Sequence, residues 1–338
     1  MSFLNVVRRR LIFLVLVLLG VTLITFTISH LIPGDPARMI AGDRATPEIV
    51  AKIRDDLGLD RPLYEQYARY VTGIVQGDFG TSIRPRRPVL EDLRIFFPAT
   101  LELALVALLV ATSLGVPLGV ASAVWKNKLI DQFVRVIAVT GISTPAFWLG
   151  LLVILLFYGQ LGLLPSGGRI DPSMDVPATI TGFLLVDSLL AGRFDAFASA
   201  FKHLILPAFT LGFVHLGVVA RQVRAALLDE LQQDYVRTAR ANGISSFRIV
   251  FTEALPNAMI PSITVLGLAL GDLLYGAVLT ETVFAWPGMG AYVVNSIQAL
   301  DFPAVMGFTV VVSLAYVLIN LAVDLIYMAV DPRIREVS

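Results

Sequence analysis

Six stretches of mostly apolar residues, each between 17 and 28 residues long, restrict the fold of this chain more than any other feature. They span residues 11–32, 99–125, 136–161, 204–220, 260–284 and 303–330. A helix of about 20 apolar residues crosses the hydrocarbon core of a lipid bilayer. We therefore predict an all-α, polytopic membrane protein with six transmembrane helices.

The composition supports a lipid environment and excludes several classes of function. Hydrophobic residues make up 56% of the chain and charged residues 15%, with a mean hydropathy of +0.78. Soluble domains are about 45–50% apolar and about 25% charged. The net charge is zero, so no nucleic-acid partner is expected. Because the chain has no cysteine and its three histidines lack metal-ligand spacing, we expect neither a disulfide nor a metal site.

Two apolar runs have a second interpretation. Residues 180–190 are too few to span a bilayer and include Asp187, so we expect them at the membrane interface or buried in a loop. Residues 11–32 lie where a secretory signal peptide would lie. The run is too long for a signal-peptide core and lacks a small-x-small cleavage site, which favours a retained span.

Basic residues in the short loops predict the orientation. They precede the first span and fill the turn after the second: Arg8, Arg9, Arg10, Lys126 and Lys128. The loop 285–302 contains no Lys or Arg. Because short cytoplasmic loops are enriched in Lys and Arg, both termini are predicted to be cytoplasmic.

The spans divide the chain into four parts: a cytoplasmic N-terminus with the first helix (1–32), an external helical segment (33–97), a five-helix core (98–330) and a cytoplasmic tail (331–338). In the external segment, Thr46 and Pro47 predict a helix start and Gly58 a helix end. A second short helix is expected from Pro62. This segment is either a small cap on the outer face or a platform for a soluble partner.

The core contains a loop, 221–257, that is too polar to cross a bilayer. It carries five arginines: Arg221, Arg224, Arg237, Arg240 and Arg248. The first two are expected to snorkel from the end of the fourth span. A short helix over 235–241 is predicted to end at Gly243, which tolerates a left-handed cap, and a second helix to begin near Ser245. The loop is either a docking surface for another subunit or a solvated amphipathic loop near anionic lipid.

No set of residues resembles a catalytic site. The ionisable residues within the spans form no pair at helical spacing: Glu102, His215, Asp272, Glu281 and Asp324. None of the four lysines follows a glycine, so the phosphate-binding Gly-Lys-Ser/Thr motif is absent. We therefore expect no catalytic residue and no ATP site of that kind in this chain.

The loop residues 234–261, DYVRTARANGISSFRIVFTEALPNAMIP, resemble the signature cytoplasmic loop of ABC-importer permeases. That signature is Glu-Ala-Ala, three residues, Gly, nine residues, Ile, one residue and Leu-Pro. Aligned on the glycine, four positions agree: Ala239, Gly243, Leu255 and Pro256. Three positions depart: Arg237, Thr238 and Glu253.

Further segments are similar to the dipeptide, oligopeptide and nickel subgroup of these permeases, in particular its dipeptide B-type subunits. They include HLIPGDPA (30–37), GDFGTSIRPRRPV (77–89), GISTPAFWLG (141–150), ETVFAWPGMG (281–290) and NLAVDLIYMAVDPRIR (320–335). The resemblance covers nearly the whole chain except an insertion around 171–201.

The resemblance implies a type I ABC-importer permease fold in a bacterial inner membrane. It implies a homologous second permease, two cytoplasmic ABC ATPases that bind ATP and Mg, and an external binding protein. It implies no cofactor in this chain. The expected ATPase-coupling residues are Ala239, Gly243, Ile244, Ser245, Leu255 and Pro256. Relatives carry dipeptides, longer peptides, nickel chelates, glutathione or opines, and peptides are the favoured substrate.

Asp272 lies in the middle of the fifth span, where an unpaired charge is costly. It either lines the substrate pathway and contacts a substrate ammonium, or bonds between helices or to the second permease. An ion-coupled secondary transporter is the alternative class of function. Such a transporter is expected to contain inverted repeats with broken helices, and no such repeat is visible in the sequence.

Overall fold

The structure, a computed structural model, describes residues 3–31, 36–41 and 45–330 and is almost entirely helical. These residues contain no strand, apart from an isolated bridge between Thr81 and Pro88. Five helical stretches are long and apolar enough to cross a membrane, and a sixth candidate is a bent pair of helices. The predicted all-α class is confirmed, whereas the tail 331–338 lies outside the described residues.

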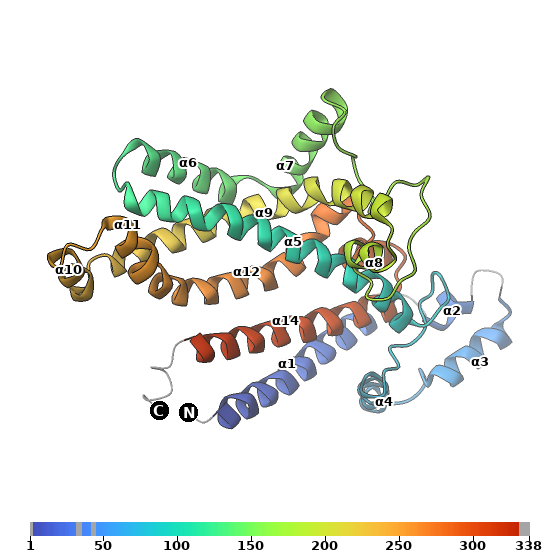
Figure 1. Cartoon of the computed structure of the whole chain (residues 1–338). Helices are drawn as coiled ribbons and strands as arrows, with labels where there is room; N and C mark the ends of the chain where they lie inside the picture. The colour runs from blue at the N-terminus through green and yellow to red at the C-terminus, as the bar shows by residue number, and fades with distance from the viewer. Residues whose placement is uncertain (1–2, 32–35, 42–44, 331–338) are drawn as a thin grey trace. The chain divides into compact units, whose positions relative to one another are not determined.

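The five long helices are α1 (Phe3–Leu31), α5 (Val89–Val124), α9 (Phe194–Glu230), α12 (Leu255–Val283) and α14 (Phe302–Val330) (Figure 1). The described residues form two compact units. The first contains residues 3–6, Pro98–Ala291 and 318–330, and the second contains Val7–Phe97 and Tyr292–Val317.

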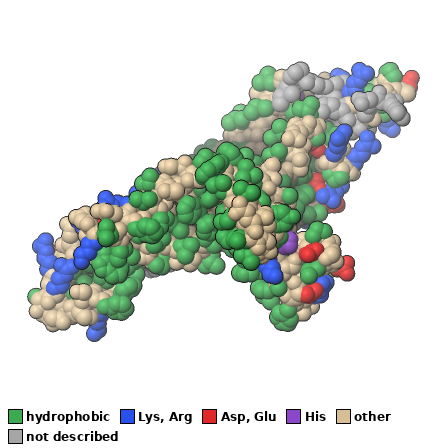
Figure 2. All heavy atoms as spheres, turned by 90° about the horizontal axis from the view of Figure 1, so that it is seen from above, with side chains coloured by type: hydrophobic (Ala, Val, Ile, Leu, Met, Phe, Trp, Pro, Cys, Tyr) green, Lys and Arg blue, Asp and Glu red, His purple; other side chains and the backbone are tan. Residues whose placement is uncertain are grey.

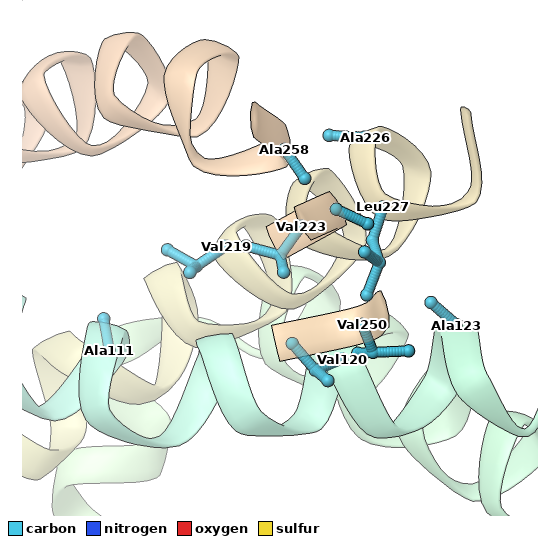
Figure 3. Packing of buried hydrophobic residues seen from close by; sticks show 10 residues of the cluster. Ala111, Val120, Ala123, Val219, Val223, Ala226, Leu227, Val250 and Ala258 are labelled. Atoms are coloured by element: carbon cyan, nitrogen blue, oxygen red, sulfur yellow. The ribbon is translucent and has the colours of Figure 1, made fainter. Parts of the chain in front are cut away.

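The core of the first unit is a cluster of small apolar side chains where α5, α9 and the start of α12 meet (Figure 3). Val223 and Leu227 of α9 are fully buried there, beside Val120 of α5. Gly115 and Gly119 permit the contact, because a Cβ on Gly119 would lie 2.7 Å from the Ala220 carbonyl oxygen. Small residues that allow close helix approach are typical of membrane proteins. Gly276, by contrast, faces open space.

A buried carboxylate ties the next helix, α6 (Leu129–Ser143), to this core. Asp131 is fully buried and accepts hydrogen bonds from Ser122 Oγ (2.6 Å) and from Arg224 Nε (2.8 Å) and Nη2 (3.0 Å). The prediction that Arg224 snorkels is therefore wrong, because its guanidinium turns inward to this carboxylate. Removing either partner would leave an uncompensated buried charge, which is strongly destabilising. The pair therefore holds α6 against α9, and the bond from Ser122 holds α6 against α5.

The third span is broken rather than straight. Helix α6 ends at Ser143, and α7 (Ala146–Val153) continues through a π-helical turn, η1 (Ile154–Gln160), after a bend of 105°. Pro145 accounts for the break, since proline disfavours helical geometry at the preceding residue, and Thr144 is indeed extended (φ −90°, ψ 122°). The prediction of one span over 136–161 is corrected to two helical pieces.

A buried carboxylate joins two distant segments of the second unit. Asp301, which lies in the segment between α12 and α14, accepts hydrogen bonds from Ser82 Oγ (2.5 Å) and the Ile83 backbone N–H (2.8 Å), which precede α5. The segments before α5 and before α14 therefore lie side by side.

The fourth span and the polar loop differ in extent from the prediction. The helix expected over 204–220 runs from Phe194 to Glu230, so the first part of the predicted loop, residues 221–230, belongs to this helix. Within the short run 180–190, the last seven residues form a helix, α8 (Leu184–Leu190), which is too short to span a bilayer. Asp187 is buried there and accepts hydrogen bonds from Thr181 and Gly182. Burial alone would raise the pKa of Asp187, but these bonds hold it below the usual value.

Two carboxylates predicted to lie within spans stabilise loops of the first unit. Glu102 of α5 pairs with Arg169 (2.5 Å) in the segment after η1. Glu281 of α12 is fully buried and accepts hydrogen bonds from Thr100 Oγ1 (2.5 Å) and the Ala291 backbone N–H (3.0 Å). It therefore anchors the turn that follows α12.

The second unit contains α2 (Pro36–Ala41), α3 (Pro47–Leu57), α4 (Leu63–Val75) and α13 (Met289–Gln298), the last divided between the units. Thr46 and Gly58 flank α3 as predicted, and Gly58 is left-handed (φ 67°). The Thr46 hydroxyl does not cap the helix; it donates to Glu48 instead. Tyr67 joins α4 to α1 through Thr22 Oγ1 (3.0 Å).

We predict that Gly119→Ala lowers the thermal unfolding midpoint of the detergent-solubilised protein. The added methyl group meets the Ala220 carbonyl oxygen and must separate α5 from α9 at a cost of about 1–3 kcal/mol. Gly276→Ala is the matched control, because it adds the same group to a helix where it meets nothing. Equal midpoints for the two variants would contradict the close approach of these helices.

Candidate functional site

The polar loop of the first unit folds into a compact helical element between α9 and α12. It consists of α10 (Asp234–Ala241), α11 (Ser246–Arg248) and a π-helical turn, η2 (Ile249–Ala254), that leads into α12. Figure 1 shows α10 and α11 at the end of the unit that also holds the turn between α5 and α6. The two helices predicted in this loop are therefore present.

The change of direction between α10 and α11 is made at Gly243. Its φ of +74° lies in the left-handed region that glycine adopts without a steric penalty. The Gly243 N–H donates to the Arg240 carbonyl (3.0 Å) and the Ile244 N–H to the Ala239 carbonyl (3.1 Å). These two bonds form a Schellman cap, which satisfies the last carbonyls of α10.

The residue that starts the next helix is fixed in the same way. Ser245 is the N-cap of α11, and its hydroxyl oxygen accepts a hydrogen bond from the Arg248 N–H (3.4 Å). Such a cap satisfies a backbone donor at the helix start. One cap ends α10 and another begins α11 within three residues, so the turn has a single well-defined backbone path.

The inner side of the loop is a small apolar cluster. Val236 and Ala239 of α10 are buried against Ile249, and Ile244 packs beside them. The adjacent residue, Val250, belongs to the larger cluster formed with α5 and α9 (Figure 3). Ile249 and Val250 thus join α10 to the membrane helices through continuous side-chain contact.

The start of the loop is also joined to the start of α12. Tyr235 Oη donates to Glu230 Oε2 (2.7 Å) and accepts from Asn257 Nδ2 (3.3 Å). Burial raises the pKa of Tyr235 above its usual value. The loop is therefore fixed to α9, α5 and α12 and can move with them as one body.

The outer side of the loop is basic, with two exposed aromatic rings. Figure 2 shows hydrophobic side chains along much of the visible flank and Lys and Arg side chains at the end where α10 lies. The exposed cations of this end are Lys126, Lys128, Arg221, Arg237, Arg240 and Arg248. Phe247 is 73% exposed and Phe251 45% exposed, with ring centroids 4.6 Å apart. Exposed aromatic residues on a polar surface are typical of protein contacts.

The structure places the six predicted coupling residues at different depths. Gly243, Ser245 and Pro256 are exposed, and Ile244 and Leu255 are partly buried. Ala239 is only 8% exposed and faces Ile249, so in this chain its side chain positions α10 and does not lie on the outer surface.

Sequence reasoning missed Phe247 and Phe251. Their spacing of four residues, in the segment FRIVF, was the available signal, because residues at i and i+4 share one face of a helix.

Asp272 lies on an exposed stripe of α12, away from the loop. The stripe consists of Leu268, Asp272, Tyr275 and Leu279, at helical spacing. His215 of α9, which is partly buried, is close enough to interact electrostatically with Asp272. The residues of α12 on either side of this stripe, such as Gly271 and Leu273, are buried. Asp272 is therefore exposed on the surface of the first unit, next to His215.

Within the described ranges, no three His, Asp or Glu side chains gather as a metal site.

Comparisons with known proteins identify the family of this chain. Residues 115–336 match the family described as "Binding-protein-dependent transport system inner membrane component", and residues 3–104 match the N-terminal region of such membrane components.

Three relatives match nearly end to end. The chain is 67% identical to the probable D,D-dipeptide transport system permease protein DdpB of Escherichia coli, covering 99% of this chain and 98% of that protein. It is 45% identical to the di/tripeptide transport system permease protein DppB of Pseudomonas aeruginosa (98% and 99%). It is 42% identical to the glutathione transport system permease protein GsiC of Salmonella paratyphi A (98% and 99%).

Proposed function

This chain belongs to the family of binding-protein-dependent transport system inner membrane components, and from that premise we propose that it is a permease subunit of an ATP-driven importer for di- and oligopeptides. As a member, it is a multi-pass inner-membrane protein. The observation that carries the proposal is the capped turn at Gly243, which holds a basic, aromatic surface rigidly on the membrane helices.

In this proposal, two cytoplasmic ATPase subunits bind ATP and Mg, and this chain contributes no nucleotide site. One ATPase receives the outer side of the loop, with Phe247 as an apolar anchor and the arginines around it. Gly243, Ile244 and Ser245 set the direction of α11, while Ala239 holds α10 in place. Leu255 packs against the α5–α9 cluster, and Pro256 lies in the first turn of α12. When the ATPases close, the loop and the membrane helices it contacts rotate together as a rigid body.

The relatives support peptides as the substrate class. Their names specify D,D-dipeptides, di- and tripeptides, and glutathione, which is itself a short peptide. The 67% identity favours dipeptides, and glutathione is the second candidate. An external binding protein delivers the peptide, and a homologous second permease completes the pathway.

The proposed orientation has both termini in the cytoplasm. Its support is the charge at the loop end of the first unit, where six exposed Lys and Arg side chains surround α10. Cytoplasmic loops are enriched in these residues. In this orientation, the segments around Ser82 and Asp301 lie on the external side of the membrane.

Asp272 is proposed to line the substrate pathway. Its side chain is exposed at the middle of a span, where contact with lipid would be costly, so this face of α12 must meet water or a partner. A substrate pathway between this chain and the second permease provides both water and a partner protein at this face. The carboxylate suits the ammonium group of a peptide.

We predict that Gly243→Val uncouples ATP hydrolysis from transport. A β-branched residue in the left-handed region is strained by about 1–3 kcal/mol, which displaces α11 and Phe247 from their docking positions. In proteoliposomes containing the complete transporter and binding protein, peptide uptake per ATP hydrolysed should fall about tenfold.

Gly243→Asn is the matched control, since asparagine adopts the left-handed region more readily and no neighbouring atom obstructs its Cβ. It should retain most of the coupling. If the valine variant transports as efficiently as the asparagine variant, the turn has no coupling role.

We further predict that Asp272→Asn raises the KM for dipeptide uptake several-fold without changing the amount of assembled transporter. The substitution keeps the size of the side chain and removes the charge that attracts an ammonium group. Tyr275→Phe, on the same exposed stripe, is the control. Unchanged uptake and substrate preference in Asp272→Asn would exclude Asp272 from the pathway.

A further inference from the structure

The turn between α5 and α6 in the first unit has a fixed backbone. Asn127 adopts a φ of +63°, in the left-handed region that asparagine tolerates better than most other residues. Its N–H donates to the buried carboxylate of Asp131 (2.8 Å), and the Lys128 N–H donates to the Trp125 carbonyl (3.0 Å). We refer to residues 125–128 as the lysine turn.

The lysine turn presents two exposed cations on this backbone. Lys126 and Lys128 are exposed, and neither forms an ion pair with any residue that the structure describes. The negative charge of Asp131 is already compensated, because Arg224 donates to it with Nε (2.8 Å) and Nη2 (3.0 Å). The two lysine ammonium groups are therefore available to an anion from outside the chain.

Helix α6, which follows the turn, buries only one narrow stripe. Its four buried residues lie on one face at helical spacing: Asp131, Val134, Ala138 and Gly141. This stripe packs closely against α9, because a Cβ on Gly141 would lie 2.8 Å from the Phe213 carbonyl oxygen. Helix α6 therefore lies at an edge of the first unit (Figure 1).

The remaining surface of α6 is mainly apolar. Six large apolar side chains are exposed there: Leu129, Ile130, Phe133, Val136, Val139 and Ile142. At about 3.6 residues per turn, they cover about 240° of the helix circumference. A helix that packs through one face typically buries an apolar stripe of about 100°. An exposed apolar arc of more than twice that width is suited to lipid, which surrounds a helix on every open side.

The lysine turn lies at the level where lipid headgroups meet this apolar arc. Lys128 is followed directly by Leu129, which is 82% exposed and begins the arc. Trp125 is 43% exposed at the other end of the turn, and tryptophan is enriched at membrane–water interfaces. The next cation, Arg135, has a side chain 54% exposed and lies about 9 Å further along the helix. A headgroup layer of about 5–8 Å accommodates both lysines and, through its long side chain, Arg135.

We propose that the lysine turn binds the phosphate of an anionic phospholipid in the cytoplasmic leaflet. The acyl chains of this lipid lie along Leu129, Phe133 and Val136 of α6. Lysine binds phosphate as a point charge, and two such charges favour an anionic lipid over a zwitterionic one. The inference goes beyond peptide transport, and it rests on the proposed orientation only for the choice of leaflet.

Native mass spectrometry of the detergent-purified complete transporter, titrated with phosphatidylglycerol, tests the proposal. A lysine near an anionic surface contributes about fivefold to binding, so Lys126→Gln/Lys128→Gln should weaken the binding of one phosphatidylglycerol molecule at least about tenfold. Lys126→Arg/Lys128→Arg keeps both charges and should bind as the wild type does. Arg237→Gln/Arg240→Gln removes two exposed cations from the polar loop at the same end of the unit and should leave this binding unchanged. The affinity for phosphatidylcholine should be the same in all of these proteins.

Three outcomes would overturn the proposal. The first is equal phosphatidylglycerol affinity in Lys126→Gln/Lys128→Gln and Arg237→Gln/Arg240→Gln. The second is unchanged lipid affinity with loss of an ATPase or the second permease from the complex, which assigns the turn to a protein contact. The third is displacement of the lipid by an equal concentration of glycerol 3-phosphate, which has no acyl chains and identifies a soluble phosphate as the ligand. None of these outcomes bears on peptide transport, which the uptake assay with Gly243→Val tests separately.

Discussion

The close packing of α5 against α9 at Gly115 and Gly119 is the contact on which the rest of the first unit depends. A Cβ at either glycine would meet Val219 or Val223 within about van der Waals contact or closer. Because the two helices meet there, Val250 packs against both of them. This contact holds the polar loop against the helices. The buried Asp131–Arg224 pair then adds α6 to the same body. Packing, not local propensity, therefore decides where the loop lies.

Such an arrangement explains how a short polar loop can transmit force. A loop held only by its two ends would deform when pushed, and little motion would reach the spans. Here α10 contacts Ile249, Val250 contacts α5 and α9, and Tyr235 joins the start of α10 to the start of α12. The caps at Gly243 and Ser245 fix the backbone between them. Interfaces that move as rigid bodies use contacts of this kind.

The sequence predicts the features that depend on nearby residues. The long apolar runs, the left-handed turn at Gly243 and the helix start near Ser245 each follow from local chemistry, and the structure has all three. It does not predict the Asp131–Arg224 pair or the brace from Asp301 to Ser82, because the partners are separated by 93 and 219 residues. Ala239 is buried by Ile249, from a later helical turn, so its burial also depends on a contact that the sequence does not predict. The motif identifies the loop as important but does not say which side faces outward.

The central claim is that the outer side of the loop meets an ATPase subunit, and site-specific cross-linking tests it most directly. The chain has no cysteine, so a single cysteine accepts a photoreactive probe at one chosen position. Phe247 is 73% exposed on the loop, and Leu163, 64% exposed in the segment after η1, is the control on the proposed external side. In the assembled transporter, the probe on Phe247→Cys should attach to an ATPase subunit and the probe on Leu163→Cys should not. Attachment from position 247 only to lipid or to the external binding protein would contradict the account.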